Sequence, residues 1–269
     1  MKYFLIFIFF MFLNNIVSAE PLIKDTIIYK IIEGNELRLY VTSPTNNNKK
    51  YPCLLFFYGG GWKSKNINQF EPFCEYFSKR GYVCIRAEYR VEIDDNATPF
   101  ESLSDARSSI RYIRKHAEEL NIDTAKIAVG GGSAGGHLAI ACATAKIYDD
   151  KFDDLSVSCL PNALLLYNPV IDNGPSGYGF KRIGDEYKNF SPLHNLYKGI
   201  PPTTFFLGEK DKLIPIETAK YFQTSMHRLG NRCDLYLFKG EGHGFFNSER
   251  YIYQILSLSE KFLESLKWN

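Results

Sequence analysis

The chain has 269 residues and a formal net charge of +2, with 32 Lys and Arg against 30 Asp and Glu. The basic residues are scattered rather than gathered into a stripe, which argues against a nucleic-acid partner. Residues 20–269 are enough for one large α/β domain that can bury a core without disulfide staples.

Residues 1–19 have the pattern of a secretory signal peptide. Lys2 supplies a positive charge, residues 3–13 are an unbroken apolar run, and Val17-Ser18-Ala19 is a small-residue cleavage site. The apolar run is short for a membrane span, although a retained signal anchor is the alternative. We therefore expect a secreted or periplasmic protein that has no stable membrane anchor after cleavage.

The six cysteines of an exported chain could form three disulfides, but their spacing is irregular and no C-x-x-C motif occurs. Cys53, Cys84 and Cys142 lie within apolar strand or helix patterns, where buried thiols are common. We expect mostly free, buried thiols with at most one disulfide.

Apolar runs alternate with helical patterns along the chain. Strands are predicted at residues 26–32, 37–41, 53–58, 82–88, 126–130, 163–167, 203–207 and 234–238. Helices are predicted at residues 70–80, 103–120, 134–145, 216–229 and 251–266. The first two strands look like an antiparallel hairpin at one edge. The alternation predicts a single α/β domain at residues 20–269, with a mostly parallel eight-stranded sheet and helices on both faces.

Ser133 lies where a predicted strand turns directly into a helix, framed by Gly131 and Gly135 as G-x-S-x-G. Such a reversal strains the backbone at the serine, and side chains at the two glycines would collide there. The hydroxyl is then held out at the end of the strand, with the Ala134 amide facing a developing oxyanion.

The same letters also fit the dinucleotide fingerprint G-x-G-x-x-G, so the motif alone leaves two interpretations open. A dinucleotide site would follow the first strand of its domain and would place an acidic residue at the end of the next strand. Here five strands come before or at the motif, and the next strand ends in Tyr167-Asn168-Pro169. The order of the elements therefore favours the nucleophile elbow.

Three glycines before Trp62 leave successive backbone amides unshielded after the third predicted strand. Placed beside the serine, the amides of Gly60 and Gly61 would complete an oxyanion hole with that of Ala134. A plain glycine turn is the alternative interpretation.

Asp211 and His243 each follow a late strand and could serve as the acid and the base of a catalytic triad. The chain order Ser133, Asp211, His243 is the order that a hydrolase elbow requires. Asp172, after the sixth strand, is the second candidate for the acid. His137, one turn into the elbow helix, is expected to be a packed, hydrogen-bonded histidine.

These motifs together resemble the α/β-hydrolase superfamily, and within it the esterases related to hormone-sensitive lipase and the BD-FAE-like carbohydrate esterases. The resemblance spans nearly all of residues 20–269, through YGGGW, AEYR, GGSAGGHLA, PNALLLYNP, SPLHN, GEKDKLIP and GEGHGF. It implies Ser133, Asp211 and His243 as the triad, with the oxyanion donors named above. The family usually has a histidine where Tyr58 stands.

The resemblance and the predicted export together imply a secreted serine esterase that removes acetyl or feruloyl groups from a plant polysaccharide such as xylan. No long insertion indicates a large cap domain, so the site is expected to be open, bordered at most by residues 172–198. Trp62 and His194 are candidate substrate contacts. A peptidase of the prolyl-oligopeptidase type and an inactive hydrolase-fold binding module are the alternatives. No cofactor is expected, no cluster has the spacing of metal ligands, and the oligomeric state stays open.

Overall fold

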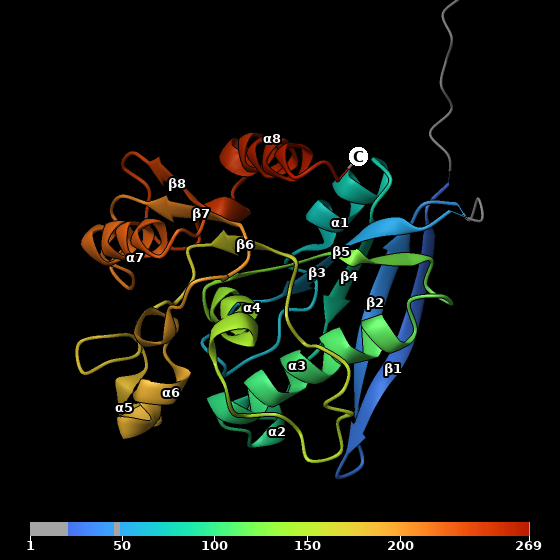
Figure 1. Cartoon of the computed structure of the whole chain (residues 1–269), viewed down its shortest axis with the longest axis horizontal. Coiled ribbons are helices and arrows are strands. Elements are labelled where there is room, and N and C mark those ends of the chain that lie inside the picture. The colour runs from blue at the N-terminus through green and yellow to red at the C-terminus, as the bar shows by residue number, and fades with distance from the viewer. Residues whose placement is uncertain (1–20, 46–48, 269) are drawn as a thin grey trace, which may run out of the picture.

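An eight-stranded sheet forms the centre of the computed structural model, which describes residues 21–45 and 49–268 (Figure 1). The strands are β1 (Ile23–Ile32), β2 (Asn35–Ser43), β3 (Tyr51–Phe57), β4 (Val83–Ala87), β5 (Ile122–Gly132), β6 (Ala163–Tyr167), β7 (Thr203–Gly208) and β8 (Cys233–Phe238). Their order in the sheet is β1-β2-β4-β3-β5-β6-β7-β8. β2 pairs antiparallel with β1 and β4, and every other pair is parallel. The predicted mostly parallel sheet with an edge hairpin is confirmed. The predicted signal peptide lies outside the described residues.

Helices cover both faces of the sheet. The α-helices are α1 (Glu71–Ser78), α2 (Glu92–Asp95), α3 (Pro99–Lys115), α4 (Ala134–Thr144), α5 (Phe180–Ile183), α6 (Tyr187–Phe190), α7 (Ile216–Arg228) and α8 (Glu249–Ser265). Short 3-10 helices are η1 (Gly184–Glu186), η2 (Pro192–Asn195) and η3 (Phe245–Asn247). Leu55 and the next residue, Phe56, point to opposite faces, as pleating requires, and belong to different core clusters. The cluster on one face includes buried residues of α3, α4 and α7, and the cluster on the other face includes buried residues of α1 and α8.

α3 begins four residues earlier than the sequence pattern predicted, because a capping box starts it at Pro99. The Thr98 hydroxyl accepts a hydrogen bond from the Glu101 amide (3.4 Å), and the Glu101 carboxylate accepts one from the Thr98 amide (2.7 Å). These bonds satisfy two amides that the helix itself cannot pair.

Residues 172–198 fold into the short helices α5, η1, α6 and η2 rather than into a separate helical domain. Figure 1 shows α5 and α6 together at one end of the molecule. Among the described residues, no helix combines the length and apolar content that a membrane crossing needs.

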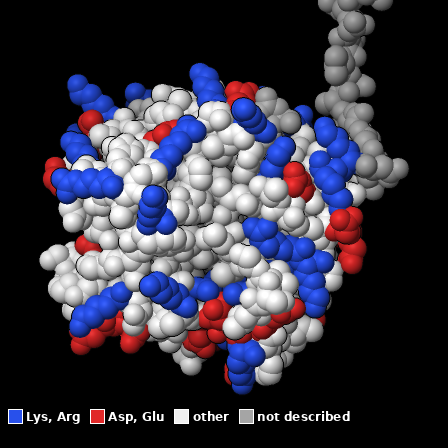
Figure 2. Space-filling model, viewed as in Figure 1, with Lys and Arg blue, Asp and Glu red and all other residues white. Residues whose placement is uncertain are grey.

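The surface in Figure 2 carries Lys and Arg in several separate groups, with Asp and Glu among them. The six cysteines are all buried and unpaired.

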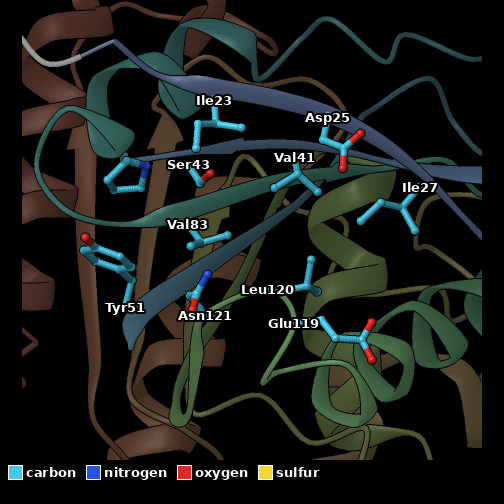
Figure 3. Close-up of a pocket in the computed structure, with 11 residues that line it drawn as sticks. Ile23, Asp25, Ile27, Val41, Ser43, Tyr51, Val83, Glu119, Leu120 and Asn121 are labelled. Atoms are coloured by element: carbon cyan, nitrogen blue, oxygen red, sulfur yellow. The ribbon is translucent and has the colours of Figure 1, made fainter. Parts of the chain in front are cut away.

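A pocket in Figure 3 lies between β1, β2 and the residues after α3, lined by apolar side chains with Asp25 and Glu119 beside them. Tyr51 and Val83, the first residues of β3 and β4, also line this pocket. It therefore lies at the amino ends of the parallel strands, on the side opposite the carboxyl end of β5.

Candidate active site

Ser133 stands alone between the last residue of β5 and the first residue of α4, with φ 53° and ψ −116°. Positive φ is unfavourable for a residue that carries a Cβ. Three backbone hydrogen bonds hold the conformation: the Ser133 amide donates to Tyr167 O (3.0 Å), and its carbonyl accepts from His137 N (3.0 Å) and Val170 N (3.1 Å). The strained reversal expected from the sequence is therefore present.

The two glycines that frame Ser133 are required by close backbone contacts. A Cβ at Gly135 would overlap the carbonyl oxygens of Phe57 and Tyr58, and a Cβ at Gly131 would lie 2.5 Å from the carbonyl of Gly135. Real Cβ atoms do not approach backbone so closely. The helix can therefore start directly against β3 only with glycine at both positions.

His243 lies between β8 and η3 and links Ser133 to Asp211. Its Nε2 is 2.8 Å from Ser133 Oγ, and its Nδ1 is 2.7 Å from Asp211 Oδ2. Because a carboxylate only accepts hydrogen bonds, Nδ1 carries the proton, and Nε2 accepts from the serine hydroxyl when the ring is neutral. The structure thus brings the three residues predicted from chain order into one hydrogen-bonded chain.

Asp211 is held in place from its other side. Its side chain is completely buried, and its Oδ1 accepts hydrogen bonds from the amides of Leu213 (2.8 Å) and Ile214 (3.0 Å). Both carboxylate oxygens therefore have partners, which fixes the orientation of the group facing His243.

Asn168 is a site residue that the sequence did not single out. It is fully buried directly after β6, its Oδ1 accepts from Gly244 N (3.0 Å), and its Nδ2 lies 3.5 Å from His243 Nε2. Its φ of 36° lies in the left-handed region that asparagine tolerates better than most residues. Asn168 thus fixes the loop that carries His243, and its place at the end of a predicted buried strand was the available signal.

The glycine loop that carries two of the predicted oxyanion donors reaches the serine through its first residue, Gly59. A Cβ built on Gly59 would be 3.4 Å from Ser133 Cβ, so the glycine loop approaches the elbow directly. The Gly59 amide donates to Gln69 Oε1 (2.6 Å). In contrast, the amides of Gly60, Gly61 and Ala134 donate to no acceptor within residues 21–45 and 49–268. Unpaired amides near a nucleophile can bind a developing negative charge.

Trp62 does not have the exposed face that stacking on a substrate would need. Its side chain is fully buried, and the rings of His137 and Tyr178 lie against it at centroid distances of 5.1 and 5.8 Å. The sequence could not reveal this burial, because the covering residues come from α4 and from the segment after β6. Trp62 is instead a core side chain packed against α4 and the segment after β6.

His194 and Asp172 contact each other rather than the triad. His194 Nδ1 is 3.0 Å from Ser191 Oγ and 3.7 Å from Asp172 Oδ1, and Asp172 Oδ1 also accepts from Gly174 N (2.8 Å). Within the part of the chain that the structure describes, no hydrogen bond joins either residue to His243. Asp211, rather than Asp172, is therefore the carboxylate that bonds His243.

His137 is the packed histidine that the sequence predicted. It is fully buried, and its Nε2 lies 3.2 Å from the carbonyl of Phe190. Burial lowers the pKa of the His137 imidazole to about 3, so the ring is neutral near pH 7. Its Nδ1 and the Trp62 Nε1 beside it have no hydrogen-bond partner among the described residues. The described residues also contain no group of three His, Cys, Asp or Glu side chains placed to hold a metal ion.

Residues 39–172 match the model of the BD-FAE family. Among solved structures, the chain resembles esterase 2 of Thermogutta terrifontis. The apo form of that esterase is 37% identical, with a TM-score of 0.87, over 91% of this chain and 95% of the other. Its propionate-bound form is 36% identical with a TM-score of 0.86, over the same shares.

Two curated relatives are named for xylan chemistry. The acetylxylan esterase of Xylanibacter ruminicola is 24% identical over 70% of this chain and 39% of its own length. Endo-1,4-beta-xylanase B of Butyrivibrio fibrisolvens is 25% identical over 74% of this chain and 33% of its own length. The chain thus spans well under half the length of either of these two relatives.

Proposed function

Because the chain belongs to the esterases of the α/β-hydrolase superfamily, we propose that it hydrolyses short acyl esters through a covalent acyl-enzyme on Ser133. The observation that carries the proposal is the continuous hydrogen-bonded chain from Ser133 Oγ to His243 Nε2 (2.8 Å) and from His243 Nδ1 to Asp211 Oδ2 (2.7 Å). These are the distances at which a base can take the serine proton and a carboxylate can fix its tautomer.

In the first half-reaction, Ser133 Oγ attacks the carbonyl carbon of the ester while His243 Nε2 takes the hydroxyl proton. Asp211 stabilises the imidazolium that forms. The tetrahedral intermediate then collapses, the bond to the alcohol breaks, and His243 returns the proton to the departing alkoxide oxygen. In the second half-reaction, water attacks the acyl-serine, with His243 again taking and returning a proton, and releases the carboxylic acid.

The negative charge of each tetrahedral intermediate falls on the former carbonyl oxygen. We assign its stabilisation to the amides of Gly60, Gly61 and Ala134, since Ala134 follows the nucleophile, the glycine loop meets it at Gly59, and the three amides have no acceptor in the described structure. The Ala134 amide is also the first of α4, where the aligned peptide dipoles favour a negative charge.

We further propose that the natural substrates are acetyl or feruloyl esters on a plant polysaccharide such as xylan, reached after export through the predicted signal peptide. Two observations support this substrate class: the relatives named for xylan chemistry, and the short carboxylic acid bound in a solved structure of a similar esterase. Folding of residues 172–198 into short helices leaves no separate cap domain there, which suits a bulky substrate.

The test compares acetate release from acetylated xylan with hydrolysis of an aryl acetate and of a feruloyl ester, using residues 20–269. Ser133→Ala should reduce each activity by several orders of magnitude, on the order of 10⁶ in comparable triads. Ser156→Ala is the matched control and should be fully active, because Ser156 is exposed and, among the described residues, bonds only Asp154.

The substrates separate the parts of the proposal. Release from xylan that is lost in Ser133→Ala supports the polysaccharide esterase. Hydrolysis of the aryl acetate without release from xylan would keep the serine esterase and remove the polysaccharide substrate. A folded wild-type chain that hydrolyses none of the three esters would overturn the proposed function.

A further inference from the structure

The backbone carbonyls of residues 60–63, which follow Gly59, are all hydrogen-bonded. Gly60 O accepts from Lys63 N (3.0 Å), which closes a turn. The carbonyls of Trp62 and Lys63 accept from the amides of Glu92 (3.0 Å) and Ile93 (2.9 Å), the first two residues of α2. Three of the four carbonyls therefore depend only on backbone partners.

The fourth carbonyl, that of Gly61, depends on a side chain from a distant part of the chain. Arg182 Nη1 donates to Gly61 O at 2.8 Å, across 121 positions of sequence. Arg182 lies on α5, within the segment between β6 and β7. The same nitrogen lies 3.4 Å from Glu92 Oε2, and the guanidinium stands 5.4 Å from the centre of the Trp62 ring. One side chain thus joins the glycine loop, α2 and α5.

The loop needs such a restraint because its glycines do little to limit the rotation of the backbone. Gly60 and Gly61 have φ values of 125° and 65°, and without a Cβ their peptide planes can rotate at low cost. A larger residue at Gly61 would be strained by the φ of 65°, and its Cβ would lie 2.7 Å from the Tyr178 hydroxyl oxygen. The Gly61 carbonyl belongs to the peptide that joins Gly61 to Trp62, which is the middle of the turn that the bond from Lys63 N to Gly60 O closes. Fixing this carbonyl therefore restrains the turn that directly follows the two amides.

We propose that Arg182 is a positioning residue for the oxyanion hole: it anchors the Gly61 carbonyl, in the turn that Gly60 O closes, and thereby holds in place the loop that carries the Gly60 and Gly61 amides. The inference rests on the proposed esterase function. Because Arg182 lies on α5, the rate of acyl transfer would depend on the segment 172–198, although the hydrogen bonds and ion pairs of Arg182 include none to the triad residues. Because the oxyanion forms only on the way to the tetrahedral intermediate, Arg182 should stabilise the transition state and contribute little to the affinity for the ester.

The test measures kcat and KM for an aryl acetate in Arg182→Met, Arg182→Lys and Lys181→Met. Arg182→Met keeps much of the aliphatic stem but removes the donors, and kcat should fall about 10- to 100-fold while KM changes less than about twofold. Arg182→Lys retains a cation that can donate one bond and should recover part of the rate. Lys181→Met alters the exposed neighbour on α5 and should match the wild type.

A second readout separates positioning from general stability. Affinity for a trifluoromethyl ketone, which forms a tetrahedral oxyanion adduct, should fall in Arg182→Met by about the same factor as kcat/KM. Glu92→Gln weakens the ion pair but leaves the bond to Gly61 O, so its kcat should fall less than that of Arg182→Met.

Two results would overturn the inference while leaving the esterase function intact. One is an Arg182→Met protein that melts at a lower temperature but keeps the wild-type kcat and inhibitor affinity, since Arg182 would then be only a structural clamp. The other is a rise in KM with unchanged kcat, which would place Arg182 in ester binding. A wild-type chain that does not hydrolyse the aryl acetate would overturn both proposals together.

Discussion

Tyr58 and Tyr89 each bind the other's backbone. The Tyr58 hydroxyl donates to Tyr89 O (3.0 Å), the Tyr89 hydroxyl donates to Tyr58 O (2.7 Å), and the two rings stack with centroids 4.3 Å apart. Tyr58 immediately precedes the glycine loop, at the position where related esterases usually have a histidine. The tyrosine pair therefore braces the residue that precedes the loop.

Removal of the Tyr58 hydroxyl should destabilise the protein. In Tyr58→Phe the buried carbonyl of Tyr89 loses its partner, so the free energy of unfolding in urea should fall by about 1–3 kcal/mol. Tyr253→Phe, at a tyrosine that is 76% exposed, is the control and should be close to neutral. Equal stability of the two variants would show that the pair does not brace the loop.

A methyl group at the elbow should prevent normal folding. Gly135→Ala would place a Cβ against the carbonyl oxygens of Phe57 and Tyr58, which belong to the backbone of β3 and the residue after it and cannot easily move. We expect a loss of stability of several kcal/mol or insoluble protein. Gly242→Ala, where the nearest atom outside the adjacent residues is 3.9 Å away, should change stability by less than about 1 kcal/mol. A stable Gly135→Ala protein would contradict the tight elbow packing.

The cysteines should be inert in the folded protein. Burial raises the pKa of the Cys53, Cys74 and Cys142 thiols well above the ordinary value, and that of Cys233 to about 12. Because the thiolate is the reactive form, an aromatic disulfide reagent at pH 8 should label none of the six cysteines until denaturant is added. Six thiols should then react without a reductant. Fewer than six would reveal a disulfide, and rapid labelling of the native protein would contradict the burial.

His137 should make the protein sensitive to acid. Its pKa is lowered to about 3 from 6.5 by burial, so the unfolded chain binds a proton below pH 6.5 while the folded chain stays neutral until about pH 3. This contribution to stability is therefore full above pH 6.5 and is lost as the pH falls toward 3, by up to about 1.4 kcal/mol per pH unit. The free energy of unfolding in urea, measured between about pH 7.5 and 4.5, should depend less steeply on pH in His137→Gln. Identical slopes would contradict a neutral buried imidazole.

The sequence allowed the triad to be predicted because its constraints are local. Ser133, Asp211 and His243 each follow a strand of the sheet, two of them lie among glycines, and parallel strands place their carboxyl ends on the same side of the sheet. The elbow strain at Ser133 follows from steric rules that apply to any strand that turns directly into a helix. These predictions needed the order of elements but no knowledge of which helices pack together.

What the sequence could not predict depends on contacts between distant segments. The burial of Trp62 requires Tyr178 and His137 to cover it, and the bond from Arg182 to Gly61 requires α5 to lie against the glycine loop. α2 and α5 have four residues each, too few to show a helical period. Their place in the fold is set by tertiary contacts rather than by their own sequence pattern.

The central claim is that Ser133 is a nucleophile activated by His243, and covalent labelling tests it most directly. Residues 20–269 would be incubated with an aryl dialkyl phosphate, digested, and mapped by mass spectrometry, with Ser133→Ala and His243→Ala treated in parallel. We predict one dialkylphosphoryl group per chain, on Ser133, absent from Ser133→Ala and formed far more slowly in His243→Ala. Modification at another residue, or a His243→Ala protein that reacts at the wild-type rate, would contradict the account.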